Sequence, residues 1–251
     1  DNFADIVDKS DGIMVARGDL GMEIPMHQIF LAQKRMIKRC NEHGKPVVTA
    51  TQMLESMTGA PRPTRAEATD VANAILDGTD CVMLSGETAA GDYPVHAVHS
   101  MAQICGEAEA HIDPVSVYRR ILERQEIPMK NFESVASTSV RAAEKAGARL
   151  IISLARTGMV AHLMAKYRPA VPILMVVLDE NNDGSAQSLA RRSLVYRGII
   201  PLVVPSVGDY RTQLMEAIDH AVKLGLVVTN DKVIGVHALG KDSVMKVLDV
   251  H

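Results

Sequence analysis

Apolar and polar positions alternate in a regular way along the whole chain. Short apolar and β-branched runs are each followed by a longer stretch of helical periodicity, the pattern of repeated βα units around parallel strands. In the first half the strand-like runs recur about every 35 residues, close to the spacing in a barrel where roughly 250 residues form eight units. The predicted strands span residues 11–19, 45–52 and 80–88, and the predicted helices span 26–43, 64–77 and 92–110.

The alternation of strands and helices resumes at about Phe132, but the end of the second half has a different pattern. Two final apolar runs, separated by Gly240-Lys241-Asp242, predict a hairpin. We therefore expect an open, largely parallel α/β sheet with helices on both faces and an antiparallel edge. Its predicted strands span 149–154, 172–178, 199–204, 232–237 and 243–249, and its predicted helices span 133–146, 157–167, 184–195 and 209–224.

The segment between the two halves has a different character. Residues 113–131 contain Pro114 and Pro128 but no clear strand, so they are predicted to connect two domains. The expected division is residues 1–112, then the connector, then residues 132–251.

Some helix ends are marked in the sequence. Thr64 followed by Glu67 forms a capping-box pattern that opens a helix, and Gly78 stands where that helix should end in a left-handed residue. The preceding helix is expected to stop at Gly44, with Pro46 shortly after it.

Composition and charge narrow the possible partners. The chain has 251 residues, 47% of them hydrophobic and 23% charged, with a formal net charge of -3. This balance favours neither nucleic acid nor an anionic membrane surface as a partner. No apolar stretch is long enough to span a bilayer, and the first residues lack the pattern of a signal peptide, so a cytoplasmic protein is expected. Three well-separated cysteines predict buried thiols rather than disulfides or a zinc site: Cys40, Cys81 and Cys105.

Each predicted strand of the first half ends in polar residues. In a βα barrel these ends meet at the face that carries the active site. Gly18-Asp19 and Gly86-Glu87 each place a glycine, which allows close approach to the backbone, before an acid that can bind a hard cation. The pattern predicts a metal-assisted anion site, although an acid after glycine is also common in ordinary loops. The polar ends are Arg17-Gly18-Asp19, Thr49-Ala50-Thr51-Gln52 and Ser85-Gly86-Glu87-Thr88.

Four motifs in the first half resemble those of the pyruvate kinase family, in the same order and at the same spacing. They are Val15–Gly21 with Glu23-Ile24-Pro25, Ala50–Met57, Pro61–Glu67 and Met83–Ala89. The resemblance continues through Lys166–Pro169 and Tyr196–Gly198, so it covers essentially the whole chain. It implies the last three βα units of a (β/α)8 TIM barrel, followed by an open, mostly parallel, three-layer α/β C-terminal domain.

The resemblance also implies an activity. Members of this family transfer the phosphoryl group of phosphoenolpyruvate to ADP, giving pyruvate and ATP in glycolysis. They use Mg²⁺, for which Mn²⁺ can substitute, and K⁺, and they assemble as homo-oligomers, typically tetramers. Phosphoryl transfer depends on positioning and charge neutralisation more than on covalent chemistry, which suits polar strand ends.

Roles for individual residues follow from the same resemblance. Asp19 would be a Mg²⁺ ligand, and the backbone amides of Gly18 and Asp19 would bind the substrate carboxylate. The Thr51 hydroxyl would contact the substrate and help position its enolate for protonation. Ser85 and Glu87 would either support the residues that contact substrate or belong to a proton relay. Arg17 would bind substrate phosphate, although a tie between subunits or a structural salt bridge are alternatives that also apply to Arg65.

The family's Lys-x-Glu pair, which supplies a phosphoryl-facing lysine and a second Mg²⁺ ligand, does not occur in this sequence. We therefore expect an incomplete portion of a pyruvate kinase that is inactive alone. A catalytically silent regulatory or interaction fragment is the alternative, and turnover of phosphoenolpyruvate with ADP separates the two. Without the motifs, another Mg²⁺-dependent barrel acting on enolpyruvate, such as an aldolase or lyase, would be the prediction.

A second candidate site lies in the second half, where the strand ending at Leu154 runs into a predicted helix. Helix N-termini bind anions through free N–H groups and the helix dipole. In relatives activated by sugar phosphates this turn supplies several hydroxyls, whereas here Met159 and Val160 leave only Thr157 and Gly158 as effector contacts. Activation by fructose bisphosphate is therefore not expected, and Thr157 could instead be an N-cap.

Overall fold

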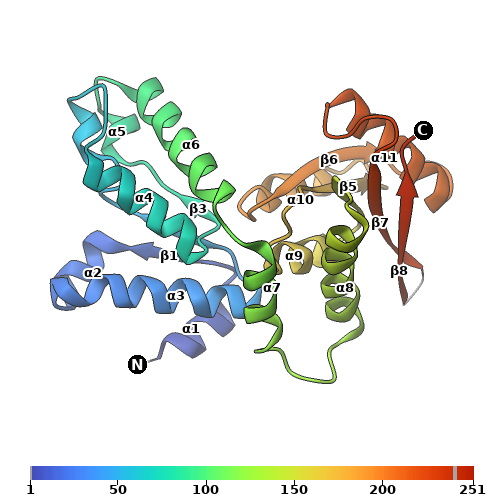
Figure 1. Ribbon diagram of the computed structural model, residues 1–251, viewed down its shortest axis with the longest axis horizontal. Coiled ribbons are helices and arrows are strands. Elements are labelled where there is room, and N and C mark those ends of the chain that lie inside the picture. The colour runs from blue at the N-terminus through green and yellow to red at the C-terminus, as the bar shows by residue number, and fades with distance from the viewer. Residues whose placement is uncertain (1, 240–241) are drawn as a thin grey trace. The chain divides into compact units, whose positions relative to one another are not determined.

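The computed structural model describes residues 2–239 and 242–251 (Figure 1). The chain forms two compact units, Asp1–Asp113 and Pro114–His251. Each unit alternates strands and helices as the sequence pattern predicts. Gly240 and Lys241, which belong to the predicted hairpin turn, lie outside the described residues.

The first unit is built on a three-stranded parallel sheet in the order β1-β2-β3. Val15 of β1 pairs with Thr49 of β2, and Thr49 pairs in turn with Val82 of β3. The elements of this unit are α1 (Phe3–Lys9), β1 (Ile13–Ala16), α2 (Arg17–Glu23), η1 (Met26–Gln28), α3 (Ile29–His43), β2 (Val47–Ala50), η2 (Glu55–Thr58), α4 (Arg65–Asp77), β3 (Cys81–Val82), α5 (Gly86–Ala89) and α6 (Pro94–Ala110).

The strands of this sheet are shorter than predicted, because their polar ends leave the ladder. Thr51 and Gln52 have positive φ angles of 67° and 53°, so the backbone of β2 is no longer extended after Ala50. The neighbouring strands therefore have no further β2 residues with which to form ladder hydrogen bonds. Residues predicted to end the outer strands instead form helical turns: Arg17 begins α2, and Glu87 lies in α5.

The predicted helix ends are confirmed. The Thr64 side chain accepts the Glu67 amide while the Glu67 carboxylate accepts the Thr64 amide, which completes the capping box. Both helix-ending glycines, Gly44 and Gly78, are left-handed, with φ of 64° and 104°. A Cβ at Gly78 would lie 2.5 Å from the Asn41 Nδ2, and other residues rarely adopt this φ, so glycine is favoured there.

Helices cover only one face of the three-stranded sheet. On that face Val15 and Val47 are fully buried, in a cluster with Ile37 of α3. On the opposite face Met14 is 51% exposed, and Val48 is only partly buried. Strands of parallel sheets are normally covered on both faces. In the described chain, this sheet lacks one of its two layers.

The second unit contains a five-stranded sheet in the order β6-β5-β4-β7-β8, parallel except for the antiparallel pair β7 and β8. The prediction of an open parallel sheet with an antiparallel edge is confirmed. Its elements are α7 (Pro114–Leu122), α8 (Asn131–Ala146), β4 (Leu150–Ala155), α9 (Met159–Lys166), β5 (Ile173–Asp179), α10 (Ser185–Ser193), β6 (Ile199–Pro205), α11 (Tyr210–Lys223), β7 (Lys232–Leu239) and β8 (Asp242–Asp249).

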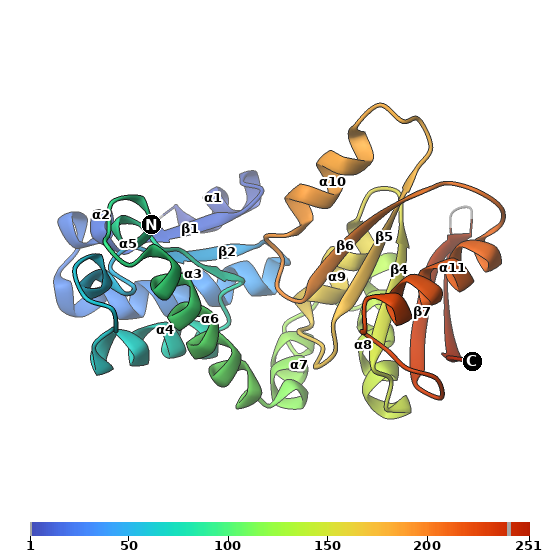
Figure 2. The same cartoon turned by 90° about the horizontal axis from the view of Figure 1, so that it is seen from above.

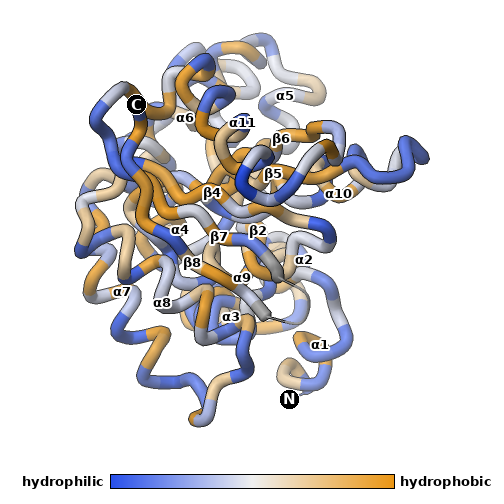
Figure 3. Tube along the Cα trace, turned by 90° about the vertical axis from the view of Figure 1, so that its right-hand side faces the viewer, coloured by the Kyte–Doolittle hydropathy of each residue, from blue (hydrophilic) through white to orange (hydrophobic). Residues whose placement is uncertain are grey.

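Both faces of this second sheet are covered. Ile151 and Ile173 lie in the core formed with α8, α9 and α10, whereas Ile152 and Leu174 lie in the core formed with α11. Figure 2 shows these helices beside the sheet. Alternate residues of one strand therefore serve two cores. The central strand β4 is accordingly mostly hydrophobic, with the buried Ser153 as its polar residue (Figure 3).

The predicted connector contains a helix that belongs to the second unit. Ile121 of α7 is 5% exposed and lies in the core that also holds α8 and α9. The Tyr118 hydroxyl lies 2.8 Å from the Ser137 Oγ of α8. Proline at position 114 is compatible with this helix because it occupies the first turn, where a backbone N–H is not needed.

Within the described part of the chain, no helix is both long and apolar enough to cross a membrane.

Candidate active site

The loop that follows β2 is the centre of the candidate site. Its residue Thr51 adopts a left-handed backbone conformation, which is unusual for a β-branched side chain and costs roughly 1–3 kcal/mol. The Thr51 hydroxyl lies 2.6 Å from the Ala50 carbonyl, to which it donates, and 2.8 Å from the Gly18 amide, from which it accepts. Two of the predicted substrate-binding groups are thus brought into direct contact.

Arg17, at the start of α2, binds the same loop from the β1 side. Its Nη2 donates to the Thr51 carbonyl at 2.7 Å, and its Nε lies 3.2 Å from the carbonyls of Ala50 and Thr51. Its Nη1 forms an ion pair with Asp70 of α4 at 2.6 Å. The sequence interpretation left substrate binding and a structural salt bridge open for Arg17, and a salt bridge is present.

Glu87 approaches the other end of the loop from the β3 side. Its side chain is fully buried, and its two oxygens accept the backbone amides of Leu54 at 3.0 Å and Ser85 at 2.7 Å. Ser85 therefore meets Glu87 through its backbone. A buried carboxylate requires such donors, because burial without them is costly.

Asp19, the predicted metal ligand, is exposed in the first turn of α2. The described residues contain no group of three or more His, Cys, Asp or Glu side chains that could hold a metal ion. Mg²⁺ is often bound by one or two carboxylates together with substrate phosphates and water, so a single exposed carboxylate fits one ligand position.

Glu67 and Asp70 take part in this region in ways that the sequence reasoning missed. Beyond its capping role, Glu67 accepts the Ser56 amide at 2.7 Å and thereby fixes η2. Burial raises the pKa of Glu67, but hydrogen bonds from Ser56 and Thr64 outweigh it and hold this pKa below its ordinary value. The capping pattern was a sequence signal for Glu67. No pattern near Asp70 in the sequence indicates that it pairs with Arg17.

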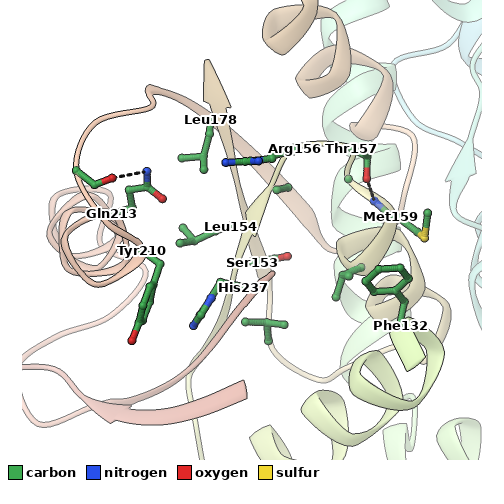
Figure 4. Close-up of a pocket in the computed structure, with 15 residues that line it drawn as sticks. Phe132, Ser153, Leu154, Arg156, Thr157, Met159, Leu178, Tyr210, Gln213 and His237 are labelled. Carbon is green, nitrogen blue, oxygen red and sulfur yellow. Dashed lines mark hydrogen bonds between the residues drawn. The ribbon is translucent and has the colours of Figure 1, made fainter. Parts of the chain in front are cut away.

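The second unit has a cavity of about 400 Å³ beside the turn between β4 and α9 (Figure 4). Gly158, not Thr157, is the N-cap of α9, and the Thr157 Oγ1 lies 3.5 Å from the Met159 amide. Arg156 contributes a cation that is paired with Glu180 at 2.9 Å. The cavity is lined by Phe132, Ser153, Leu154, Ala155, Arg156, Thr157, Gly158, Met159, Val160, Leu178, Gly208, Tyr210, Gln213, Val236 and His237.

His162 lies behind this turn. Its ring stacks on Tyr196 with 4.0 Å between ring centroids, and its Nε2 lies 2.9 Å from the Ser193 Oγ. Because that hydroxyl donates to the Leu189 carbonyl at 2.8 Å, His162 is the donor to Ser193. Burial lowers the pKa of His162 to about 4, with a smaller effect from the Arg192 charge. The imidazole is therefore neutral near pH 7.

Comparisons with known proteins show which family the chain resembles. The family model described as pyruvate kinase, barrel domain, matches residues 1–98, and the model described as pyruvate kinase, alpha/beta domain, matches residues 133–248. The cytosolic isozyme of pyruvate kinase from Nicotiana tabacum is 54% identical over 99% of this chain and 51% of its own length. The cytosolic isozyme from Glycine max is 52% identical over 98% of this chain and 50% of its own length.

Solved structures give the same result. A crystal structure of a pyruvate kinase from Cryptosporidium parvum matches with a TM-score of 0.94 and 45% identity, over 100% of this chain and 49% of that one. The Cryptosporidium parvum pyruvate kinase in complex with ADP matches with a TM-score of 0.90 and 44% identity, over 98% of this chain and 49% of that one.

The two units, one built on a three-stranded parallel sheet and the other on a five-stranded mixed sheet, thus define an α/β protein. The chain belongs to the pyruvate kinase family. It spans about half the length of the curated relatives it matches.

Proposed function

We propose that this chain is part of a pyruvate kinase, which transfers the phosphoryl group of phosphoenolpyruvate to ADP and yields pyruvate and ATP in glycolysis. The observation that carries the proposal is the 2.8 Å contact between the Gly18 amide and the Thr51 hydroxyl, because it joins two of the family's motifs in one site. The exposed Asp19 carboxylate follows Gly18 directly. The Cryptosporidium parvum relative has been solved in complex with ADP, which supports ADP as the second substrate.

The proposed roles use the groups that the strand ends present. Asp19 would ligate Mg²⁺ or Mn²⁺, and the amides of Gly18 and Asp19 would bind the substrate carboxylate. Mg²⁺ and K⁺ would supply positive charge against the phosphoryl and enolate oxygens. The single Gly18 N–H donates to the Thr51 hydroxyl in this structure, so it would have to exchange or share that hydrogen bond when it binds the substrate carboxylate. Ser85 and Glu87 would support proton transfer to the enolate.

The proposed enzyme needs residues that this chain does not contain. The half-exposed Met14 on the uncovered face of the first sheet supports a larger barrel around it, of which β1, β2 and β3 would be part. We expect no pyruvate from this chain alone. Joining it to the N-terminal half of the Nicotiana tabacum relative should restore Mg²⁺-dependent turnover in a coupled assay. A joined protein that folds but stays inactive would count against the proposed pyruvate kinase function. Turnover by the 251-residue chain alone would show that activity does not require the N-terminal half.

Thr51 offers a sharper test in the joined protein. Thr51→Val keeps the shape but removes the hydroxyl that accepts from Gly18, and kcat should fall roughly tenfold or more. Thr51→Ser, which keeps the hydroxyl, serves as the control. Unchanged kcat in Thr51→Val would remove this hydroxyl from the mechanism.

A regulatory or interaction role for the chain is the second candidate, and the cavity of about 400 Å³ beside Thr157 and Gly158 favours it. In that unit Thr157 and Gly158 would be the effector contacts, but Met159 and Val160 add no side-chain donors beside them. Titration of the joined enzyme with fructose 1,6-bisphosphate should leave substrate saturation unchanged. A shift that is lost in Thr157→Ala would show an effector site.

Assembly and location are proposed from the relatives. Several of them are named cytosolic isozymes, which supports a cytoplasmic protein. We propose a homo-oligomer, with a tetramer as the expected form, and light scattering of the joined protein would give its mass.

A further inference from the structure

We propose that Arg17 is a positioning residue, which holds the left-handed Thr51 turn in place instead of binding substrate. This inference rests on the proposed function, because it concerns the residue whose hydroxyl would meet the substrate. The motif sequence alone assigns no such role, since the contacts join residues of two different motifs.

The hydrogen bonds of the Arg17 guanidinium account for all three of its nitrogens. Nε lies 3.2 Å from the carbonyls of Ala50 and Thr51, and Nη2 lies 2.7 Å from the Thr51 carbonyl, 3.3 Å from the Gln52 carbonyl and 2.8 Å from the Met53 Sδ. Nη1 is paired with the Asp70 carboxylate at 2.6 Å. The cation is therefore directed into the protein, and its side chain is 14% exposed.

The backbone at this place needs such a partner. Thr51 and Gln52 are two successive residues other than glycine with left-handed backbones. This conformation persists only where surrounding contacts enforce it. The carbonyls that Arg17 binds belong to these two residues and to Ala50 before them. Because the planar guanidinium has five N–H groups in a fixed fork, it can bind several carbonyls at once, which the ammonium of lysine cannot do in the same geometry.

Glu87 fixes the other end of the same loop. Whereas Arg17 donates to carbonyls at Ala50 and Thr51, the buried Glu87 carboxylate accepts the Leu54 amide at 3.0 Å. With the far end fixed in this way, loss of Arg17 would release the near end, where Thr51 lies. The Gly18 amide would then lose its acceptor, because that bond depends on the position of the Thr51 hydroxyl.

This gives a local readout that needs no activity. Gly18 is exposed, so the hydrogen bond to Thr51 is what protects its amide from exchange with solvent. In the 251-residue chain, Arg17→Lys should speed exchange of the Gly18 amide about fivefold to tenfold, the loss expected for one net hydrogen bond. Thr51→Val should produce the same increase, and Arg35→Lys, a change of an exposed arginine on α3, should produce none.

A second variant guards against general unfolding. Asp70→Asn removes the charge that anchors Nη1 while all other partners of Arg17 remain, so it should give a smaller increase at Gly18 in a folded chain. Exchange in the middle of α3 serves as the measure of folding. Unchanged Gly18 exchange in Arg17→Lys, with α3 intact, would overturn the proposal.

Kinetics of the joined protein separate positioning from binding. A positioning role predicts that Arg17→Lys lowers kcat about tenfold to a hundredfold and that the same variant shows the faster Gly18 exchange. A raised KM with unchanged Gly18 exchange would show that Arg17 binds substrate and would overturn the proposal. If the joined protein is inactive, the exchange experiment still decides the role of Arg17, and only the proposed function fails.

Discussion

The two sheets of this chain differ in what holds them. In the second unit, β4 and β5 are buried on both faces, and Ile151, Ile152, Ile173 and Leu174 are all fully buried. In the first unit one face of the sheet packs on helices while Met14, on the other face, is 51% exposed. Since burial of apolar surface is the main stabilising term in folding, the second unit is expected to be the more stable of the two.

The difference extends to the polar groups. In the first unit, polar contacts tie the loop around Thr51 to its neighbours, with Arg17 binding one end of it and Glu87 the other. In the second unit, the most buried charge serves the core, since Lys166 binds Glu133 at 2.8 Å and Gln125 at 2.6 Å. The first unit thus uses polar contacts to shape a candidate site, whereas the second uses them to join helices.

Limited proteolysis should show the largest contrast. We expect cleavage within residues 1–113 first, because the uncovered sheet opens more easily, while the second unit resists. The protected fragment should begin near Pro114 and not near Phe132, because Ile121 of α7 packs into the second core. Mass spectrometry of the fragments gives their ends. A protected fragment from the first unit would reverse the comparison.

Among the single substitutions, the one that breaks the buried ion pair of the second unit should lower the unfolding free energy most. Lys166→Met leaves the Glu133 carboxylate without its cation, and the unfolding free energy should fall by about 3–5 kcal/mol. The control is Arg141→Met, which removes a more exposed pair with Glu144 and should cost at most about 1 kcal/mol. Urea unfolding followed by circular dichroism measures both. Equal effects would show that the buried pair contributes no more than a surface pair.

A matched pair of truncations tests the sheets directly. Leu174→Ala, in the doubly covered sheet, should destabilise the second unit by about 2–5 kcal/mol. Met14→Ala, on the uncovered face, should change the stability of the first unit by less than about 1 kcal/mol, because half of that side chain already meets solvent. A cost at Met14 similar to that at Leu174 would mean that the exposed face is covered in solution.

Acid should weaken the second unit through His162. Because the folded-state pKa of His162 is lowered to about 4 from 6.5, the unfolded chain takes up a proton first as the pH falls. The stabilising contribution of neutral His162 is therefore complete above pH 6.5 and is lost between pH 6.5 and about 4. In His162→Gln this part of the pH dependence of the urea midpoint should disappear, whereas His99→Gln, at an exposed position on α6, should retain it.

Local sequence determined much of the fold. The capping box at Thr64 and the left-handed glycines Gly44 and Gly78 were predictable, because each depends on residues within one helical turn. The order of strands and helices followed from periodicity for the same reason. The family motifs also predicted Gly18 and Thr51 as site residues.

Tertiary structure alone decided what those residues contact. The shortened strands, the left-handed Thr51 and the buried state of Glu87 could not be predicted, because they depend on partners more than thirty residues away in the sequence. Such partners meet only through the parallel pairing of β1 with β2 and of β2 with β3. A residue pattern can show that a strand ends in polar groups, but which backbone atoms they bind is set by the register between strands.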